Sequence, residues 1–482
     1  MYQAYSVAAI RDAETQEMAR IGEGVLMRRA ACALAQVALR ELRRLAGNPY
    51  GSWVTILAGS GNNGGDGLFA GVRLLRRGVR VRAWRAGGRV HDAGWAAFLA
   101  AGGRELSLAE LVAELDQNDL VIDAILGIGG KAGLHGVSAD VATAVFNAQV
   151  PVIAVDLPSG VPAEPVFFPG RTTFVRPNVT VAFGGRKPAH VLEPAKSVLG
   201  RVEVIDIGLP KMEPTLTCWE PSDIAEFWPV PSAASDKYSR GVVGIDAGSA
   251  QYPGAGLLAV SGALKAGAGM VRFLGEAEVA RRVSQAYPNA VLAAGQVQSW
   301  VVGCGWGEQP YGAGKIARII AAGIPVVIDA DGLRYLPTGE MGSLARSGRP
   351  GQILLTPHAG ELARLLDVKR EEVVANPLPY VSQAADRWQA VVLLKGATQL
   401  VATPDSPVIS VAVPGPAWAA QAGSGDLLAG ICGALLAAGL DLRQAALAGA
   451  SIQALGARQV DAPISPQDLQ LPIRELLSGS LG

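Results

Sequence analysis

Residues 52–78 have the sequence SWVTILAGSGNNGGDGLFAGVRLLRRG. An apolar, β-branched run ends in a glycine-rich loop, and a helical segment begins directly after the loop. This order predicts the first strand, turn and helix of a parallel sheet that binds a nucleotide. Residues 59–64 match G-x-G-x-x-G, in which glycines permit a tight turn and let the backbone approach a phosphate at the helix N-terminus.

The loop departs from a simple dinucleotide site. Such a site has an acidic residue ~20 positions further on, whereas this chain has Arg82 and Arg85 in that region. The loop instead contains side-chain oxygens at Asn62, Asn63 and Asp66. Local turn chemistry is one explanation, because Asn and Asp favour such turns. Binding of a ligand by these oxygens is the other.

Short apolar runs alternate with helical stretches along the whole chain, which predicts parallel sheets covered by helices on both faces. A Pro-rich, weakly periodic segment, 206–235, separates two halves. We therefore expect an α/β protein of two domains, 1–220 and 221–482, the first a Rossmann-like three-layer sandwich. The clearest strands are expected at 52–59, 119–127, 151–160, 241–248, 300–305, 325–332, 353–358 and 391–396.

The composition argues against several other classes of protein. The 42 Lys and Arg balance 42 Asp and Glu, so the chain lacks the basic excess of a nucleic-acid-binding protein. The four cysteines lie far apart without metal-binding spacing, which argues against a zinc site and fits a reducing compartment. We see no signal-peptide core and no apolar run of ~18 residues. A soluble, cytoplasmic protein without a membrane partner is expected.

Three of the expected strands in the first half end in polar side chains. Asn63 lies in the loop after the first strand, Asp123 lies in the end of the second, and Asp156 and Ser159 lie in the end of the third. Ligands of parallel sheets bind beyond the carboxyl ends of the strands, so these side chains are expected to converge. Oxygens of Asn63, Asp123 and Ser159 suit a hard cation, and Asp156 remains available as an acid–base group. For either aspartate taken alone, capping or a core hydrogen bond is an equally good explanation.

The motifs GNNGGDG, IDAILGIGG and VDLPSGV resemble the NAD(P)H-hydrate epimerase family, whose members interconvert the R and S epimers of hydrated NADH or NADPH. The resemblance implies that Asn63, Asp123 and Ser159 ligate potassium. It implies that Asp156 is the acid–base group, assisted by Lys187 of FGGRKPAH. It also implies a set of residues that hold the hydrated cofactor: Asn62, Asn63, Gly64, Gly65, Asp66, Gly127, Ile128, Gly129, Gly130, Lys131, Ala132 and Gly133.

A second constellation lies near the C-terminus, where Ala422-Gly423-Ser424-Gly425-Asp426 precedes a helical segment. Small residues at a helix N-terminus point N–H groups at one spot, which attracts a phosphate. Asp426 at that spot can accept a proton from a hydroxyl that attacks phosphorus. An ordinary glycine-rich helix start is the plainer explanation. Three further expected strands end in the polar segments 395–398, 329–331 and 356–361. The segment 329–331 could contact Mg²⁺ through water.

These segments resemble the ribokinase-like superfamily and, within it, the ADP-dependent NAD(P)H-hydrate dehydratases. The resemblance implies a ribokinase-like second domain with Asp426 as the catalytic base. It implies that Ala255, Gly305 and His358 line the hydrated cofactor. Cys304 departs from the family, which often has Pro before this glycine. The residues implied to hold the nucleotide are Lys395, Gly396, Ala397, Thr398, Gln399 and Gly425.

The order of the two halves resembles the bifunctional nicotinamide nucleotide repair enzymes. The resemblance implies epimerisation of R- and S-NAD(P)HX at C6 with K⁺ in the first domain. It implies ADP-dependent dehydration of the S epimer in the second domain, with Mg²⁺, which gives NAD(P)H, AMP and phosphate. The implied partners are NADHX, NADPHX and ADP, and a homo-oligomer is expected.

Two alternatives remain open. GSGD alone permits a small-molecule kinase of the vitamin type, fused to a binding domain. The N-terminal half, which has LMRRAA at 26–31 where the family usually has LMERAG, could bind a nucleotide or a partner protein without catalysis. The reaction product distinguishes the first alternative, and loss of R-epimer use in an Asp156→Asn variant distinguishes the second.

Overall fold

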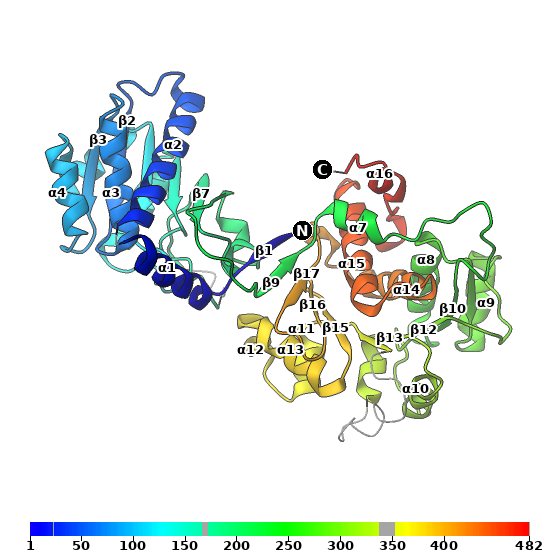
Figure 1. Cartoon of the computed structure of the whole chain (residues 1–482). Helices are drawn as coiled ribbons and strands as arrows, with labels where there is room; N and C mark the ends of the chain where they lie inside the picture. Colours follow the sequence, from blue (N-terminus) through cyan, green and yellow to red (C-terminus); the bar gives the residue numbers. More distant parts are fainter. Residues whose placement is uncertain (23, 166–171, 337–351, 482) are drawn as a thin grey trace. The chain divides into compact units, whose positions relative to one another are not determined.

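The computed structural model describes residues 1–22, 24–165, 172–336 and 352–481 (Figure 1). Contacts divide the chain into two compact units. The N-terminal unit is Gln3–Thr215, and the C-terminal unit is Leu216–Gly482 together with Met1–Tyr2. The ammonium group of Met1 belongs to the C-terminal unit because it donates to Asp223 Oδ1 over 2.9 Å. Strand β1 (Tyr2–Ala4) spans the division.

The N-terminal unit contains a seven-stranded sheet of order β4-β3-β2-β5-β6-β7-β8. All neighbouring strands are parallel, so their carboxyl ends lie along one edge. The strands are β2 (Trp53–Ala58), β3 (Arg80–Arg85), β4 (Arg104–Leu106), β5 (Leu120–Ala124), β6 (Val152–Val155), β7 (Val179–Phe183) and β8 (Arg201–Ile205).

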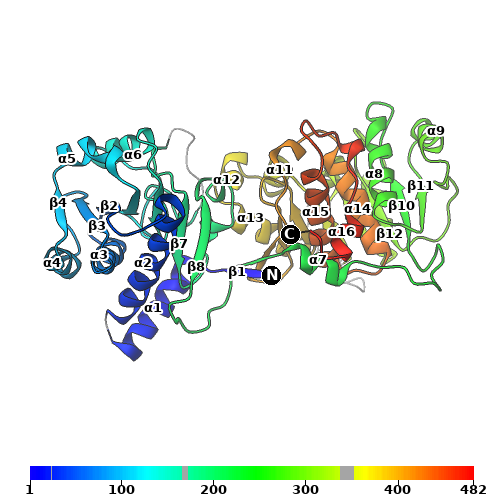
Figure 2. The ribbon, with the colours of Figure 1, turned by 90° about the horizontal axis from the view of Figure 1, so that it is seen from above.

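Helices cover both faces of this sheet (Figure 2). The central strand β5 explains the arrangement, because its alternate residues point to opposite faces. Ile122 joins the apolar cluster beneath α2, α3 and α4, whereas Val121 joins the cluster beneath α5 and α6. The expected three-layer sandwich is confirmed. The helices are α1 (Val7–Ile21), α2 (Val25–Ala46), α3 (Asn62–Leu75), α4 (Asp92–Ala100), α5 (Leu108–Ala113) and α6 (Val137–Asn147).

The C-terminal unit has a second sheet, in which the order runs β9-β17-β16-β15-β14-β13-β12-β10-β11. The strands from β15 to β11 are parallel, and β16 is antiparallel to both of its neighbours. The strands are β9 (Leu216–Cys218), β10 (Val242–Asp246), β11 (Met270–Phe273), β12 (Ser299–Val302), β13 (Val326–Ile328), β14 (Ile353–Leu355), β15 (Val391–Leu394), β16 (Leu400–Ala402) and β17 (Ile409–Val411).

The core of this unit lies where α8 (Pro253–Lys265) and α14 (Ser424–Ala437) cross. A Cβ at Gly262 would lie 2.1 Å from the carbonyl oxygen of Leu427, and one at Gly430 would lie 2.0 Å from that of Ala259. Glycine on both helices therefore permits the close approach of the two backbones. The other helices are α7 (Pro221–Phe227), α9 (Ala277–Ala286), α10 (Gly312–Ala321), α11 (Ala359–Leu366), α12 (Arg370–Ala375), α13 (Pro377–Trp388), α15 (Leu442–Arg458) and α16 (Ile473–Leu477).

Each of the eight expected strands is present, which confirms the α/β class. The Pro-rich segment 206–235 is more than a connector, because it contributes β9 and α7 to the C-terminal unit. Helix α14 is apolar because it is buried in this unit. In the described part of the chain, no helix combines the length and the apolar character needed to span a membrane.

Candidate active sites

The first turn of α3 contains the predicted loop residues from Asn62 to Asp66. A Cβ at Gly59 would lie 1.9 Å from the carbonyl oxygen of Ile125, and one at Gly64 would lie 2.0 Å from that of Gly59. Both positions therefore need glycine. The N-cap residue Gly61 offers no side-chain hydrogen bond to the helix start, so the first N–H groups of α3 remain available to an anion.

The three predicted potassium ligands converge on the loop after β5. Ser159 donates from Oγ to Asp123 Oδ1 over 2.6 Å and from N to Asp123 Oδ2 over 2.8 Å. Leu126 donates from N to Ser159 Oγ over 2.9 Å. Asn63 donates from Nδ2 to the carbonyl oxygen of Leu126 over 3.0 Å. The structure therefore brings Asn63, Asp123 and Ser159 together.

Asp123 is the ionisable member of this predicted donor set. The carboxyl group is fully buried, and burial raises its pKa to about 6 although three hydrogen bonds lower it. No ion pair of Asp123 with a basic side chain is found among the described residues. A potassium ion beside this carboxylate would offset the cost of burying the charge.

Asp156 and Lys187 form a buried ion pair between Oδ1 and Nζ. Lys187 also donates from Nζ to the carbonyl oxygen of Phe183 over 2.8 Å. Asp156 has a φ of +64°, a left-handed conformation that costs energy outside glycine. The backbone therefore turns this carboxylate toward Lys187 directly after β6.

His190 fixes the Asp156–Lys187 pair from behind. Lys187 donates from N to His190 Nδ1 over 2.9 Å, so the proton of the neutral ring is on Nε2, which donates to the carbonyl oxygen of Asp156 over 2.9 Å. Burial lowers the pKa of His190 to about 4, and the charge of Lys187 contributes. The ring is therefore neutral at physiological pH, and it positions both catalytic candidates.

Asp66 and Glu14 add two further carboxyl groups to this site. Asp66 is buried, and its Oδ1 has no hydrogen-bond partner. Burial raises the pKa of Asp66 well above its usual range, and the charges of Asp156 and Glu14 add to the rise. Burial also raises the pKa of Glu14, although the positive charge of Lys187 opposes this rise. An unpartnered buried oxygen is costly, so Asp66 is suited to accept or donate a hydrogen bond to a ligand.

The predicted loop Gly127–Gly133 borders the same site. A Cβ at Gly127 would lie 2.9 Å from Asn63 Oδ1, so glycine is needed for the close approach of the two loops. Gly133 donates from N to the carbonyl oxygen of Gly160 over 2.9 Å. Between them, the loop is exposed or half-buried. The residues in that part are Ile128, Gly129, Gly130, Lys131 and Ala132.

In the C-terminal unit, Asp426 lies in the first turn of α14. The N-cap residue Gly423 is left-handed, with a φ of +89°, and provides no side-chain cap. The N–H groups of this turn are therefore available to a phosphate. Burial raises the pKa of Asp426 to about 6, and the charge of Asp329 adds to the rise while that of Lys395 opposes it.

Lys395 is the cation of this site. Its Nζ lies 2.6 Å from Asp329 Oδ1, at the ends of β15 and β13. Burial alone would lower the pKa of Lys395, but the charges of Asp329 and Glu361 raise it above its ordinary value. A Cβ at Gly425 would lie 3.0 Å from Lys395 Nζ. The predicted nucleotide residues Lys395 and Gly425 are thus neighbours.

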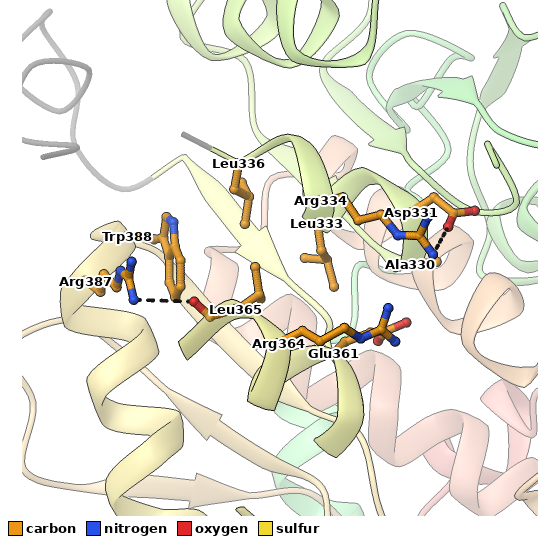
Figure 3. A pocket seen from close by; sticks show the side chains of 10 residues that line it. All are labelled: Ala330, Asp331, Leu333, Arg334, Leu336, Glu361, Arg364, Leu365, Arg387 and Trp388. Atoms are coloured by element: carbon orange, nitrogen blue, oxygen red, sulfur yellow. Dashed lines mark hydrogen bonds and ion pairs between the residues drawn. The ribbon is translucent and has the colours of Figure 1, made fainter. Parts of the chain in front are cut away.

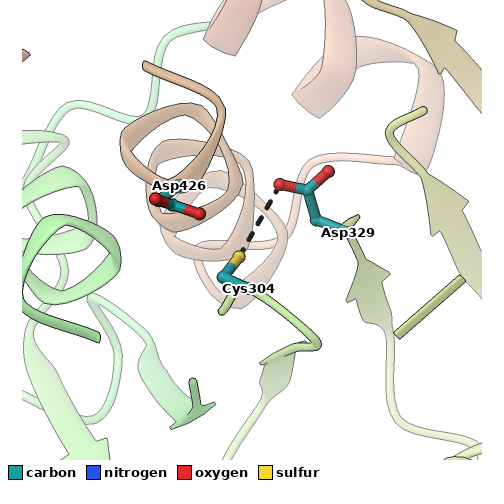
Figure 4. Close-up of side chains that lie close together, drawn as sticks. All are labelled: Cys304, Asp329 and Asp426. Atoms are coloured by element: carbon teal, nitrogen blue, oxygen red, sulfur yellow. Dashed lines mark hydrogen bonds between the residues drawn. The ribbon is translucent and has the colours of Figure 1, made fainter. Parts of the chain in front are cut away.

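Cys304 lies between the two aspartates (Figure 4). One ligand atom from each of Cys304, Asp329 and Asp426 lies within 4.8 Å of the others, and Cys304 Sγ donates to Asp329 Oδ2 over 3.7 Å. Burial and the two carboxylates raise the pKa of the thiol well above its usual range. The thiol is therefore neutral and a poor metal ligand. The carboxylates alone suit Mg²⁺.

The remaining predicted residues of the C-terminal unit lie at three places. A Cβ at Gly305 would lie 2.6 Å from Ala255 Cβ, so these two residues are in contact. His358 is exposed and caps α11, since its Nδ1 accepts from the N–H groups of Gly360 and Glu361 over 3.0 and 3.1 Å. Its Nε2 lies 3.3 Å from Glu361 Oε1. The turn between β15 and β16 contains Gly396, Ala397, Thr398 and Gln399.

A cavity of about 280 Å³ lies near this site, between the residues after β13 and the helices α11 and α13 (Figure 3). It shares Asp331 and Glu361 with the strand ends, but Asp426 and Lys395 are not among its described lining residues. Asp331 is already engaged there, because it pairs with Arg334 over 3.2 Å and accepts from Gly307 N over 2.8 Å. We assign this cavity no part in catalysis.

Two family models match the chain. The model described as NAD(P)H-hydrate dehydratase matches residues 243–473, and the model described as YjeF-related protein N-terminus matches residues 23–189. A curated protein of Mycobacterium leprae (strain TN), named bifunctional NAD(P)H-hydrate repair enzyme Nnr, is 40% identical over 480 residues, which are 98% of this chain and 97% of the relative. The chain belongs to the family of bifunctional NAD(P)H-hydrate repair enzymes.

Further relatives agree with this membership. A protein of Mycobacterium tuberculosis (strain ATCC 25618 / H37Rv) with the same name is 42% identical over 448 residues, which are 92% of this chain and 90% of the relative. A solved structure of an ADP/ATP-dependent NAD(P)H-hydrate dehydratase from Bacillus subtilis, co-crystallised with ATP/Mg²⁺, has a TM-score of 0.47 at 24% identity. It covers 54% of this chain and 96% of that chain. At this score, the likeness adds nothing to the fold described above.

Membership of the repair-enzyme family confirms the predicted family and enzyme class, and it excludes the vitamin-kinase alternative. Three structural features of the sites were not predicted from the sequence. These are Glu14 beside Asp156, His190 behind the same pair, and the contact of Cys304 with Asp329. His190 follows Lys187 by three residues, so a search around each catalytic candidate would have found it.

Proposed function

We propose that the N-terminal unit interconverts R- and S-NAD(P)HX at C6. The buried Asp156–Lys187 pair supports this proposal. Asp156 accepts the proton of the C6 hydroxyl, the C6–N1 bond breaks as the carbonyl forms, and N1 takes up a proton. Reclosure on the other face of the carbonyl returns the hydroxyl with inverted configuration. Asn62–Asp66 and the loop Gly127–Gly133 hold the hydrated cofactor beside this pair.

We propose that the C-terminal unit dehydrates S-NAD(P)HX with ADP. The observation that carries this proposal is Asp426 in the uncapped first turn of α14, with Lys395 beside it. Asp426 accepts the C6 hydroxyl proton while the hydroxyl oxygen attacks the β-phosphorus of ADP and AMP leaves. Phosphate then leaves C6 with the bonding electrons, a proton is lost from C5, and the double bond of NAD(P)H forms.

The ligands of this site follow from its residues. We propose that Lys395–Gln399 and Gly425 bind the nucleotide and that Ala255, Gly305 and His358 line the hydrated cofactor. Mg²⁺ supplies charge neutralisation at the phosphates when it is bound, and the oxygens of Asp329 face that region.

The ion, assembly and location of the protein complete the proposal. Potassium is proposed at Asn63, Asp123 and Ser159. A homo-oligomer is proposed from the family likeness, and a cytoplasmic location fits the four free cysteines.

The test is recovery of NADH absorbance from a mixture of both NADHX epimers with protein, ADP, Mg²⁺ and K⁺. Full recovery, faster than spontaneous epimerisation allows, is the expected result. Recovery of only the S share would contradict the epimerase assignment. Recovery with ATP but not with ADP would correct the nucleotide, and no recovery with either would overturn both activities.

A further inference from the structure

Helix α1 is held against the segment that leads into Lys187. Tyr5 donates from N to the carbonyl oxygen of Arg186 over 2.8 Å, one residue before Lys187. Ser6 caps α1 by accepting from Ala9 N over 3.1 Å, and its own N donates to Thr215 Oγ1 over 3.1 Å. The start of α1 is therefore fixed at the edge of the epimerase site, although no motif of the sequence marks this helix as part of that site.

Two charged residues of α1 face the predicted site. Arg11 and Glu14 are three residues apart, so they are neighbours on the helix surface. The guanidinium Nη2 of Arg11 lies 3.5 Å from the position that a Cβ would take at Gly129, in the predicted substrate loop. Glu14 is half-buried, and it lies close enough to Lys187 and Asp156 for their charges to shift its pKa. The face of α1 that carries both residues thus borders the loop and the ion pair.

In the described ranges, the guanidinium of Arg11 makes no hydrogen bond and no ion pair. Its charge acts on Glu14, whose pKa it lowers as the smallest of the contributions there. Arg20, on the same helix, differs because it donates from Nε to Glu17 Oε2 over 2.8 Å and from Nη2 to Oε1 over 2.6 Å. A free guanidinium beside a glycine-rich loop is suited to two parallel hydrogen bonds with a phosphate. The uncapped first turn of α3 offers N–H groups to an anion in the same site.

We propose that Arg11 binds the diphosphate of the hydrated dinucleotide, above Gly129 and the first turn of α3. The inference rests on the proposed epimerase function and adds α1 to its binding site. Arg11 is a substrate-binding residue, and it takes no part in proton transfer. Its loss should therefore weaken binding of the substrate and leave the chemical step nearly unchanged.

The experiment uses the full chain and pure R-NADHX, with ADP, Mg²⁺ and K⁺ present, and follows NADH absorbance at early times. Arg11→Gln should raise the KM for the R epimer by about 10- to 100-fold, as expected for a lost charge-assisted hydrogen bond, while kcat stays within about threefold. Arg11→Lys keeps the charge but not the paired geometry, so its KM should lie between those of the wild type and Arg11→Gln.

The matched control is Arg77→Gln. Arg77 is exposed and follows the C-terminal end of α3 (Asn62–Leu75), about 20 Å from the first turn of that helix. Its KM and kcat should equal those of the wild type. Dehydration of S-NADHX, measured in each variant, shows that the C-terminal unit is folded, and a thermal unfolding curve like that of the wild type shows that the N-terminal unit is folded.

The possible outcomes distinguish the binding role of Arg11 from the epimerase function. If the wild type converts the R epimer and Arg11→Gln does so with an unchanged KM, the role of Arg11 is wrong and the epimerase function stands. A fall in kcat without a change in KM would also overturn the binding role. If the wild type does not accelerate R-epimer use, both claims fall.

Discussion

At the residue scale, Asp123 and Asp426 share a pKa of about 6, and in both cases burial is the main cause. Their surroundings give this property different consequences. Asp426 lies beside Lys395 at a helix start that is open to a phosphate, so in the proposed reaction its ionisation would control proton transfer. Asp123 is enclosed by Ser159 and the loop after β5 without a basic partner in the described chain, so at the proposed potassium site its ionisation would control how the cation binds.

The pKa of Asp426 predicts the acid limit of dehydration. As the proposed base, Asp426 must be ionised, and its pKa is raised above the ordinary value, so we expect activity to fall as the pH drops through about 6 rather than about 4. Asp426→Asn should lower kcat for S-NADHX by about 10²- to 10⁴-fold. The measurement is a kcat profile between pH 5 and 8. An acid limit below pH 5 would contradict the role of Asp426.

The pKa of Asp123 predicts a potassium effect on stability. A folded-state pKa near 6, above the ordinary 3.8, means that the folded state binds this proton more tightly than the unfolded state does. Stability is therefore lost as the pH rises from about 4 to 6, by about 3 kcal/mol. A bound cation offsets this loss only when the carboxylate is ionised. K⁺ should thus raise the unfolding midpoint by a few degrees at pH 7.5 and hardly at pH 5.

Calorimetry of the full chain in K⁺, against tetramethylammonium at equal ionic strength, measures this effect. Asp123→Asn should abolish the difference between the two salts. Asp426→Asn is the matched control and should keep it, because Asp426 belongs to the other unit. An equal potassium effect in the wild type and in Asp123→Asn would contradict potassium binding at Asp123.

The site residues that can be predicted from the sequence are those that lie at the ends of expected strands. Asp123 lies near the end of β5, and Asn63 and Ser159 follow β2 and β6, so the parallel strands place these residues at one edge. Glu14 lies about 140 residues before Asp156, on a helix with no recognisable motif, so only the packing of α1 reveals it. Cys304 carries no metal-binding spacing, and its place between Asp329 and Asp426 depends on the register of β12 and β13.

At the scale of elements, the crossing of α8 and α14 holds Asp426 in place. Each helix has a glycine where it meets the backbone of the other. Gly430→Ala would put a Cβ 2.0 Å from the carbonyl oxygen of Ala259, so the helices must move apart. We expect a loss of about 1–3 kcal/mol in the free energy of unfolding, together with a lower kcat for dehydration.

The matched control for Gly430→Ala is Gly314→Ala. Gly314 lies inside α10, and outside the local backbone no atom lies within 4 Å of the position that a Cβ would take there. Alanine there should stabilise the chain by about 0.5–1 kcal/mol, because it favours the helix. Chemical denaturation of both variants measures the difference. Equal stability of the two variants would contradict the close crossing.

Strands with continuous apolar runs could be predicted because both faces of these sheets are covered. The short strands β9, β16 and β17 have three residues each, too few to show a period. Strands β13 and β14 are equally short but could be predicted, because each lies in an apolar run that ends in a polar segment. Because β9 is so short, it cannot be recognised from the sequence of the Pro-rich segment in which it lies. Element boundaries in that segment depend on pairing between β9 and β17, which are nearly 200 residues apart.

At the scale of the whole molecule, each unit has its own sheet, its own core and its own candidate site. The proposed acid–base groups of the two sites, Asp156 and Asp426, belong to different units. We therefore expect two chemically independent reactions that are joined by a common intermediate, S-NAD(P)HX. A substitution in one site should remove one reaction and leave the other.

Conversion of pure R-NADHX by single-site variants tests this claim most directly. With ADP, Mg²⁺ and K⁺, Asp156→Asn should form NADH from the R epimer no faster than spontaneous epimerisation allows, while it uses S-NADHX at the wild-type rate. Asp426→Asn should form NADH from either epimer about 10²- to 10⁴-fold more slowly than the wild type. An equimolar mixture of the two variants should restore rapid NADH formation from the R epimer. Rapid use of the R epimer by Asp156→Asn alone, or no recovery in the mixture, would contradict the independence of the two sites.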